Sequence, residues 1–118
     1  FRGVTGVQTC ALPILYLPLA ENAEKPKFKV CAKHPKAEGT GFVLYYTDQC
    51  PYTCYWVPRV EEVAKEHGFP LKTIHITTKE EAQNVPAPVT TYALFRDGEF
   101  VTQSIQSDKK FLALAGVK

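Results

Sequence analysis

The sequence lacks any long apolar run. No stretch approaches the roughly 20 consecutive apolar residues that a membrane-spanning helix requires. The first fourteen residues also lack the basic start and the continuous apolar stretch of a secretory signal. We therefore expect a cytoplasmic protein. With 118 residues, of which 45% are hydrophobic and 22% charged, the chain is typical of one small soluble domain with a core of its own.

The sequence also has little excess charge of either sign. Its formal net charge is +2, and the lysines between residues 25 and 36 have glutamates on both sides, Glu21, Glu24 and Glu38. Such a mixture is typical of a solvated segment, whereas a nucleic-acid-binding domain gathers its lysines and arginines on one face. We expect neither nucleic acid nor a membrane among the partners.

Cysteines are few, four in 118 residues. In a reducing compartment they indicate redox, metal-binding or buried thiols before structural disulfides. Cys31 and His34 have a ligand-like spacing, but they lie in a presumed linker, and the pair Cys50 and Cys54 has no histidine beside it. We expect no metal site. Neither a Ser-His-Asp arrangement nor a paired-carboxylate motif can be recognised from spacing.

The N-terminal third divides into two segments. Residues 4–14 look like the in-frame translation of a common sequencing-library adapter, and their apolar residues follow neither a strand nor a helix period. We expect residues 1–14 to be an artefact. Residues 15–40 then hold a strand-like apolar piece at 15–19, the end of a missing upstream domain, and a linker rich in Lys, Glu, Pro and Ala. Residues 41–118 are expected to form the compact domain.

This domain begins with alternating strand and helix signals. Residues 42–46 predict a buried strand, and residues 71–76 predict a second one. The helix between them is expected to begin at Pro51, to kink at Pro58 and to end at Gly68.

The rest of the chain predicts a short helix, a hairpin and a last helix. Residues 89–96 and 99–103 are the expected strands of the hairpin. The short helix is expected to begin with a capping box at Thr78 and to end at Pro86. Asp97 and Gly98 are the expected turn of the hairpin. The last helix is expected to begin at Ser107 or Asp108 and to end at Gly116. The predicted order is β-α-β-α-β-β-α.

Cys50 lies where the first strand ends and the long helix begins. Backbone N–H groups at a helix N-terminus lack intrahelical partners and face the positive end of the macrodipole, which stabilises a thiolate over a thiol. Asp48 opposes this, because it disfavours a second negative charge nearby. The sequence predicts a nucleophilic cysteine without fixing the size of its activation.

Cys54 follows Cys50 by one helical turn. Disulfide closure needs β-carbons about 3.5–4.5 Å apart, whereas residues one turn apart are separated by roughly 5–6 Å. If Cys50 is the N-cap, the chain could bend enough for Cys54 to reach it. A resolving thiol and a packed core thiol are both open interpretations of Cys54.

The element order and several motifs resemble the thioredoxin and glutaredoxin core. Cys50-Pro51-Tyr52 is similar to the start of the glutaredoxin motif, Pro58 matches the kinking proline of the helix, and residues 94–99 resemble the terminal hairpin turn. The resemblance implies a three-layer α/β sandwich. The chain departs from the family by having C-x-x-x-C in place of C-x-x-C.

The same resemblance implies a cis-proline opposite the first cysteine. Pro88 is our candidate, and Pro86 competes with it, because Val85-Pro86 also looks like the glutaredoxin pattern.

A second resemblance covers nearly everything after the adapter-like segment. Residues 45–53, 79–84, 90–95 and 98–102 look like the YoaP-like domain, which is found at the C-terminus of GNAT-type acetyltransferases. The resemblance implies that residues 15–19 are the last trace of an upstream acetyltransferase domain, which would be a partner of this one. No G-x-G-type loop opens a helix in this sequence. Acetyl-CoA is therefore expected only in the missing domain.

Two functions remain open. In the first, which we favour, the domain is a thiol-redox or thiol-transfer module: Cys50 attacks a protein disulfide or a small disulfide, and Cys54 or an external thiol such as glutathione resolves the mixed disulfide. In the second, a non-catalytic thioredoxin-like module binds a peptide or a small thiol, or serves the acetyltransferase. The expected substrate-binding residues are Thr47, Tyr52, Thr53 and Pro88, of which the first three have alternative roles as a strand end, a helix-surface aromatic and a first-turn hydroxyl.

Overall fold

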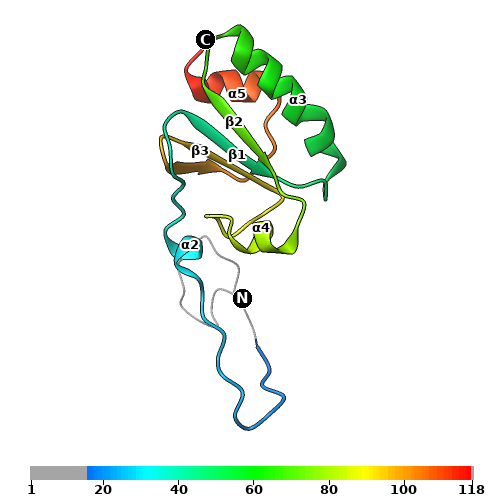
Figure 1. Ribbon diagram of the computed structural model, residues 1–118, viewed down its shortest axis with the longest axis vertical. Coiled ribbons are helices and arrows are strands. Elements are labelled where there is room, and N and C mark those ends of the chain that lie inside the picture. The colour runs from blue at the N-terminus through cyan, green and yellow to red at the C-terminus, as the bar shows by residue number, and fades with distance from the viewer. Residues whose placement is uncertain (1–15, 118) are drawn as a thin grey trace, which may run out of the picture.

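The computed structural model describes residues 16–117 as a mixed α/β fold (Figure 1). Its helices and strands are, in chain order, α2 (Val30–Lys33), β1 (Phe42–Tyr46), α3 (Pro51–Glu66), β2 (Leu71–His75), α4 (Lys79–Gln83), β3 (Tyr92–Arg96), β4 (Glu99–Thr102) and α5 (Asp108–Ala115). From β1 onward this is the β-α-β-α-β-β-α order that the sequence predicted.

The four strands form one open mixed sheet in the order β2-β1-β3-β4. β1 pairs with β2 in parallel, with Tyr46 opposite His75, and with β3 antiparallel, with Tyr46 opposite Tyr92. β3 and β4 are antiparallel neighbours joined by a tight turn. β1 and β3 are therefore the central strands of the sheet. The last residues of β1 and β2, Tyr46 and His75, lie side by side at the same edge of the sheet.

Helices cover both faces of the sheet, which gives three layers (Figure 1). α3 and α5 pack on one face over a core centred on Leu44, Leu94 and Phe111, all fully buried. α4 and the chain that follows it cover the other face, where Phe95 and Ala93 are fully buried. Alternate residues of each central strand thus enter different halves of the core.

Local signals account for the observed element ends. Pro51 occupies the first position of α3, whose missing N–H needs no partner there. Thr78 and Glu81 form both hydrogen bonds of a capping box at α4. Asp97 and Gly98 have φ angles of 50° and 86°, the left-handed pair that a two-residue hairpin turn requires. These sequence predictions are confirmed.

The strand expected at residues 15–19 is not present in the described part of that segment. Tyr16, Leu17 and Leu19 lie in irregular chain with exposed side chains. No neighbouring strand in residues 16–117 pairs with them, and a strand needs such pairing to be stable. Residue 15 and the adapter-like residues 4–14 lie outside the described chain.

Two further boundaries differ from the sequence predictions. The expected linker contains a helical turn, α2, and Lys36 forms an isolated bridge with Glu99 beside the sheet. The third strand begins at Tyr92 rather than at residue 89. The preceding segment contains Pro86 and Pro88, which have no N–H group to donate to a ladder.

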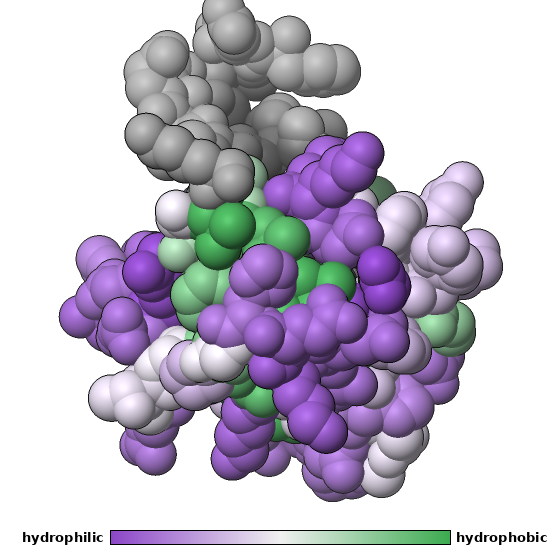
Figure 2. Space-filling model, turned by 90° about the horizontal axis from the view of Figure 1, so that it is seen from above, coloured by the Kyte–Doolittle hydropathy of each residue, from purple (hydrophilic) through white to green (hydrophobic). Residues whose placement is uncertain are grey.

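Hydrophilic side chains cover most of the face seen from above, and hydrophobic residues occupy a smaller area of it (Figure 2). Within residues 16–117, none of the helices has the length and apolar character needed to cross a membrane.

Candidate functional site

Cys50 is the N-cap residue of α3. Its backbone is extended, with φ −117° and ψ 127°, and Pro51 begins the helix directly after it. The thiol is half-buried and free, and it makes no capping hydrogen bond to the helix. The position that the sequence predicted for Cys50, at the mouth of a helix after an apolar strand, is therefore confirmed.

Thr53 and Thr47 fix the chain around Cys50. Thr53 is fully buried, and its Oγ1 lies 2.8 Å from the carbonyl oxygen of Thr47 and 2.7 Å from that of Cys50. The single hydroxyl proton is donated to one or other of these two acceptors. Thr47 is also buried, and its backbone N–H donates to the carbonyl of Thr91 across 3.2 Å. Both hydroxyl residues, which the sequence placed around the thiol, hold the strand-to-helix loop in position.

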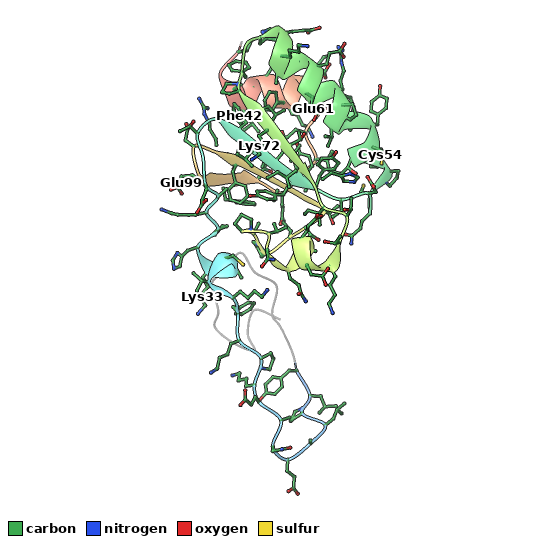
Figure 3. The ribbon with its side chains drawn as sticks, in the orientation of Figure 1. Lys33, Phe42, Cys54, Glu61, Lys72 and Glu99 are labelled. Carbon is green, nitrogen blue, oxygen red and sulfur yellow. The ribbon has the colours of Figure 1, made fainter. Side chains whose placement is uncertain are left out.

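Cys54 lies in the first turn of α3 and is exposed; Figure 3 labels it. It is not joined to Cys50, since both thiols are free. Its Sγ donates to Oδ1 of Asp48 across 3.6 Å. The second cysteine is therefore held by a carboxylate of the loop rather than by the first cysteine.

His75 enters the site from the end of β2. Its Nε2 lies 2.8 Å from Oδ2 of Asp48, and its ring stacks on that of Tyr46 with centroids 4.7 Å apart and planes 8° from parallel. His75 belongs to the strand predicted at residues 71–76, and no role in the site was predicted for it from the sequence. The signal that could have found it is the parallel pairing of β1 and β2, which brings both carboxyl ends to one edge of the sheet.

Negative charge surrounds this histidine. Burial raises the pKa of Tyr46, and the nearby carboxylates of Glu61 and Asp48 raise it further. Hydrogen bonds from the backbone of Thr77, foremost, lower the pKa of Glu81, and the charge of His75 contributes to the same shift. The imidazole therefore lies among carboxylates supplied by the β1–α3 loop and by two helices.

The remaining predicted residues lie around the loop. Tyr52 is 65% exposed on the outside of α3, and Pro88 is exposed in the segment before β3. That segment is tied to the Cys50 loop by Thr91, whose hydroxyl donates to Oε1 of Gln49 across 3.0 Å. The expected cis-proline is not found: no peptide bond in the described chain is cis, so neither Pro86 nor Pro88 is. The trans form is the intrinsically favoured one for X-Pro bonds.

An open hollow of about 430 Å³ borders the loop. Its lining includes Thr47, Asp48 and Gln49 on one side and Thr77 and Thr78 on the other, together with the apolar Ile76 and Ala82. Hydroxyl, amide and carboxylate groups of this kind suit a small polar molecule or an extended polar chain. Within residues 16–117 no three histidine, cysteine or acidic side chains are arranged to hold a metal ion.

Two comparisons relate the chain to known proteins. Residues 70–112 match the profile of the family described as YoaP-like. Over 89 residues the chain is 38% identical to a protein of Bacillus subtilis strain 168 that is named as the uncharacterized N-acetyltransferase YoaP. The match takes in 75% of this chain and 36% of that relative, so the chain spans little more than a third of the relative's length. Both comparisons support a relation of this chain to the YoaP-like family.

Proposed function

We propose that this chain is a thioredoxin-like module of an acetyltransferase-related protein and that Cys50 is the nucleophile of a thiol–disulfide exchange. The observation that carries the proposal is the free, half-buried thiol of Cys50 at the N-cap of a 16-residue helix. The orphan N–H groups and the macrodipole of such a helix stabilise an anion at that position.

The arrangement of the elements supports the thioredoxin-like assignment. The sheet has a parallel pair at one side and an antiparallel hairpin at the other, in the order β2-β1-β3-β4. α3 and α5 lie together on one face and α4 lies on the opposite one. The nucleophile then belongs to the connection between the first strand and the helix that follows it.

The proposed exchange conserves bonds and charge. The Cys50 thiolate attacks one sulfur of a disulfide R–S–S–R′, forming a Cys50–S–S–R bond and expelling R′–S⁻, which takes a proton from water. A second thiol then breaks the mixed disulfide. Cys54 is the internal candidate, and an external thiol such as glutathione is the alternative.

The relation to an acetyltransferase rests on the relative alone. Its name describes an N-acetyltransferase, and this chain matches 36% of its length. We propose that an acetyltransferase domain is the partner of the module and that acetyl-CoA is bound by that domain. The sequence described here has no glycine-rich loop opening a helix that would bind the pyrophosphate of acetyl-CoA.

Alkylation of Cys50 tests the proposal. We would treat the Cys54→Ala variant of the 118-residue chain with iodoacetamide between pH 5 and 9 and follow each cysteine-containing peptide by mass spectrometry. Cys50 is expected to react faster at neutral pH than Cys31, the internal reference, because a helix N-terminus favours the thiolate form. The unmodified chain is also expected to reduce a small disulfide, whereas Cys50→Ser is not.

The opposite result favours a binding module. If Cys50 reacts no faster than Cys31 and the Cys50→Ser variant reduces the disulfide as well as the unmodified chain does, Cys50 is a packing residue. The exposed Tyr52 and Tyr55 next to the site, 65% and 68% exposed, would then be the first residues to test for peptide binding.

A further inference from the structure

We propose that Asp48 and His75 form a positioning pair for the second thiol: Asp48 holds the S–H group of Cys54, and protonation of His75 releases it. The inference rests on the proposed function, in which Cys54 is the internal resolving thiol. It assigns to Asp48 and His75 a role in the timing of the resolving step.

Three separate elements bring the pair to the thiol. Cys54 lies in α3, Asp48 in the loop after β1 and His75 at the end of β2. Sγ of Cys54 is 3.6 Å from Oδ1 of Asp48, and Nε2 of His75 is 2.8 Å from Oδ2. The two oxygens of one carboxylate therefore serve two different partners. A change in the charge of the His75 imidazole therefore acts on the Cys54 thiol through the Asp48 side chain.

The chemistry of the contact gives the direction of the effect. A thiolate has no proton to donate, so the contact between Cys54 and Asp48 exists only while the thiol is protonated. Loss of that proton would place two negative charges next to each other, which is unfavourable. A positive charge on His75 offsets the charge of Asp48 and so reduces the repulsion of the thiolate.

Other charged groups face the imidazole from the surrounding elements. Glu81 of α4 has its pKa lowered in part by His75. Glu61 of α3 is hydrogen-bonded to Thr73, two residues before His75 in β2, and β1 contributes the stacked ring of Tyr46. The charged groups Asp48, Glu61 and Glu81 are all acidic, so each favours a positive charge on the imidazole.

Holding the thiol fits the order of the two reaction steps. Before the mixed disulfide exists, Cys54 keeps its proton and Cys50 alone is the nucleophile. In the resolving step the Cys54 sulfur bonds to the Cys50 sulfur, the Cys50–S–S–R bond breaks, and R–S⁻ leaves. The proton of Cys54 passes through the oxygen of Asp48 to water or to the departing sulfur. Because Cys50 has an extended backbone outside the helix, its sulfur is not confined to the spacing of a helical turn.

Alkylation of Cys54 in the Cys50→Ser background tests the pair. Removing the charge with Asp48→Asn is expected to raise the reaction rate of Cys54 at pH 7 at least about fivefold, the effect of one like charge about 4 Å away in bulk water. His75→Gln is expected to lower the rate of Cys54 at the acid end of the pH range tested, because it removes the charge that would offset Asp48. It should have no effect once Asp48 is already Asn. Asp48→Glu, which keeps the charge, should leave the rate within twofold of the Cys50→Ser chain.

Two controls make the result specific. His67→Gln removes a histidine at the other end of α3 and should leave the alkylation rate of Cys54 unchanged. The alkylation rate of Cys31, read from the same digest, should be the same in every variant. An Asp48→Asn variant that reacts at the original rate or more slowly, with an unchanged circular dichroism spectrum, overturns the proposal. The same holds if His75→Gln acts equally with and without Asp48.

The readout separates this inference from the proposed function. Cys54 is alkylated without any disulfide substrate, so the pair can be established even if Cys50 proves inert. Conversely, if Asp48 and His75 have no effect on Cys54 while Cys50→Ser abolishes disulfide reduction, the proposed function stands and the positioning pair does not.

Discussion

The hydroxyl of Tyr92 lies inside the core, on the face of the sheet that α3 and α5 cover. Tyr92 is 1% exposed, and its hydroxyl makes no hydrogen bond in the described chain. Burial raises the pKa of Tyr92 to about 12, although the backbone of Gln106, which is near the hydroxyl but does not meet hydrogen-bond geometry, acts in the opposite direction. An unpartnered polar group in this position costs stability at every pH and more once it can ionise.

Tyr92→Phe is therefore expected to change the alkaline limit of the protein. The unfolded chain ionises near the ordinary value of 10.0, so between pH 10 and 12 it releases a proton that the folded chain keeps. Stability of the unmodified chain then falls as the pH rises through this window. The variant should lack this part of the fall, a difference of roughly 2–3 kcal/mol by pH 12, and should be at least as stable at pH 7.

Urea titrations of both chains at pH 7, 10 and 11.5 measure this difference. Tyr45→Phe is the matched control, because Tyr45 is less buried and its pKa is raised less. Parallel loss of stability in all three chains would contradict the prediction.

The candidate site was only partly predictable from single residues. Cys50 could be placed because its signals are local: an apolar strand before it and Pro51 after it. His75 and Asp48 could not be paired, because they are 27 positions apart and meet only through the register of β1 and β2. Thr53 was expected to face the substrate, but the side of α3 on which it lies is the buried one, and this depends on which face packs against the sheet.

At the scale of elements, α5 depends on its first residue. Ser107 is the N-cap, and its side chain accepts a hydrogen bond from the backbone N–H of Lys110 across 3.3 Å. The helix is eight residues long and buries Phe111, so its own hydrogen bonds alone would be marginal. The cap and the packing of Phe111 therefore have to act together.

Ser107→Ala is expected to lower the free energy of unfolding by about 1 kcal/mol, the usual cost of losing such a cap. Thermal unfolding followed by circular dichroism measures it. Ser104→Ala, in the loop before the helix, should change the stability by less than about 0.5 kcal/mol. A Ser107→Ala chain as stable as the Ser104→Ala chain would show that packing alone holds the helix.

Elements whose ends carry strong local sequence signals were predicted almost to the residue. The capping box of α4 and the Asp97–Gly98 turn are examples, because each is fixed by contacts within a few residues. α2 was missed, since it is four residues long, has no capping hydrogen bond and buries no side chain. The strand expected at residues 15–19 failed for a different reason: its apolar residues fit a strand, but whether a strand forms depends on a neighbour that sequence reading does not supply.

At the scale of the whole molecule, the described core does not depend on the N-terminal arm, defined here as residues 16–34. Both halves of the core are built from residues between Ala37 and Ala115. We call the rest of the described chain, residues 35–117, the sheet domain. The hydrogen bond that joins the arm to it is exposed and runs from Nζ of Lys29 to the carbonyl of Gln83.

A chain beginning at Pro35 is therefore expected to fold with a melting temperature within a few degrees of the 118-residue chain. Circular dichroism should keep the same helix signal per residue of the sheet domain. A chain beginning at Gly41 would also lose the Lys36–Glu99 bridge and the contacts of Ala37 with Gly98, and it should be slightly less stable. Loss of cooperative unfolding in the chain that begins at Pro35 would contradict this division.

At this scale the order of strands and helices along the chain could be predicted, whereas the order in which the strands lie in the sheet could not. Alternating apolar runs and caps gave the β-α-β-α-β-β-α order directly. That β1 lies between β2 and β3, which decides where Cys50, Asp48 and His75 meet, follows from packing over the whole sheet. The sequence pattern contains no local signal for it.

The single tryptophan of the chain lies two residues after Cys54. Trp56 is in α3 and meets the ring of Tyr55 edge to face, with centroids 4.8 Å apart and planes 87° from each other. Since the chain has no other tryptophan, light emitted after excitation near 295 nm comes from this one helix. The protein thus has a built-in optical reporter beside its thiols, and a stopped-flow instrument could follow events at the site without any added dye.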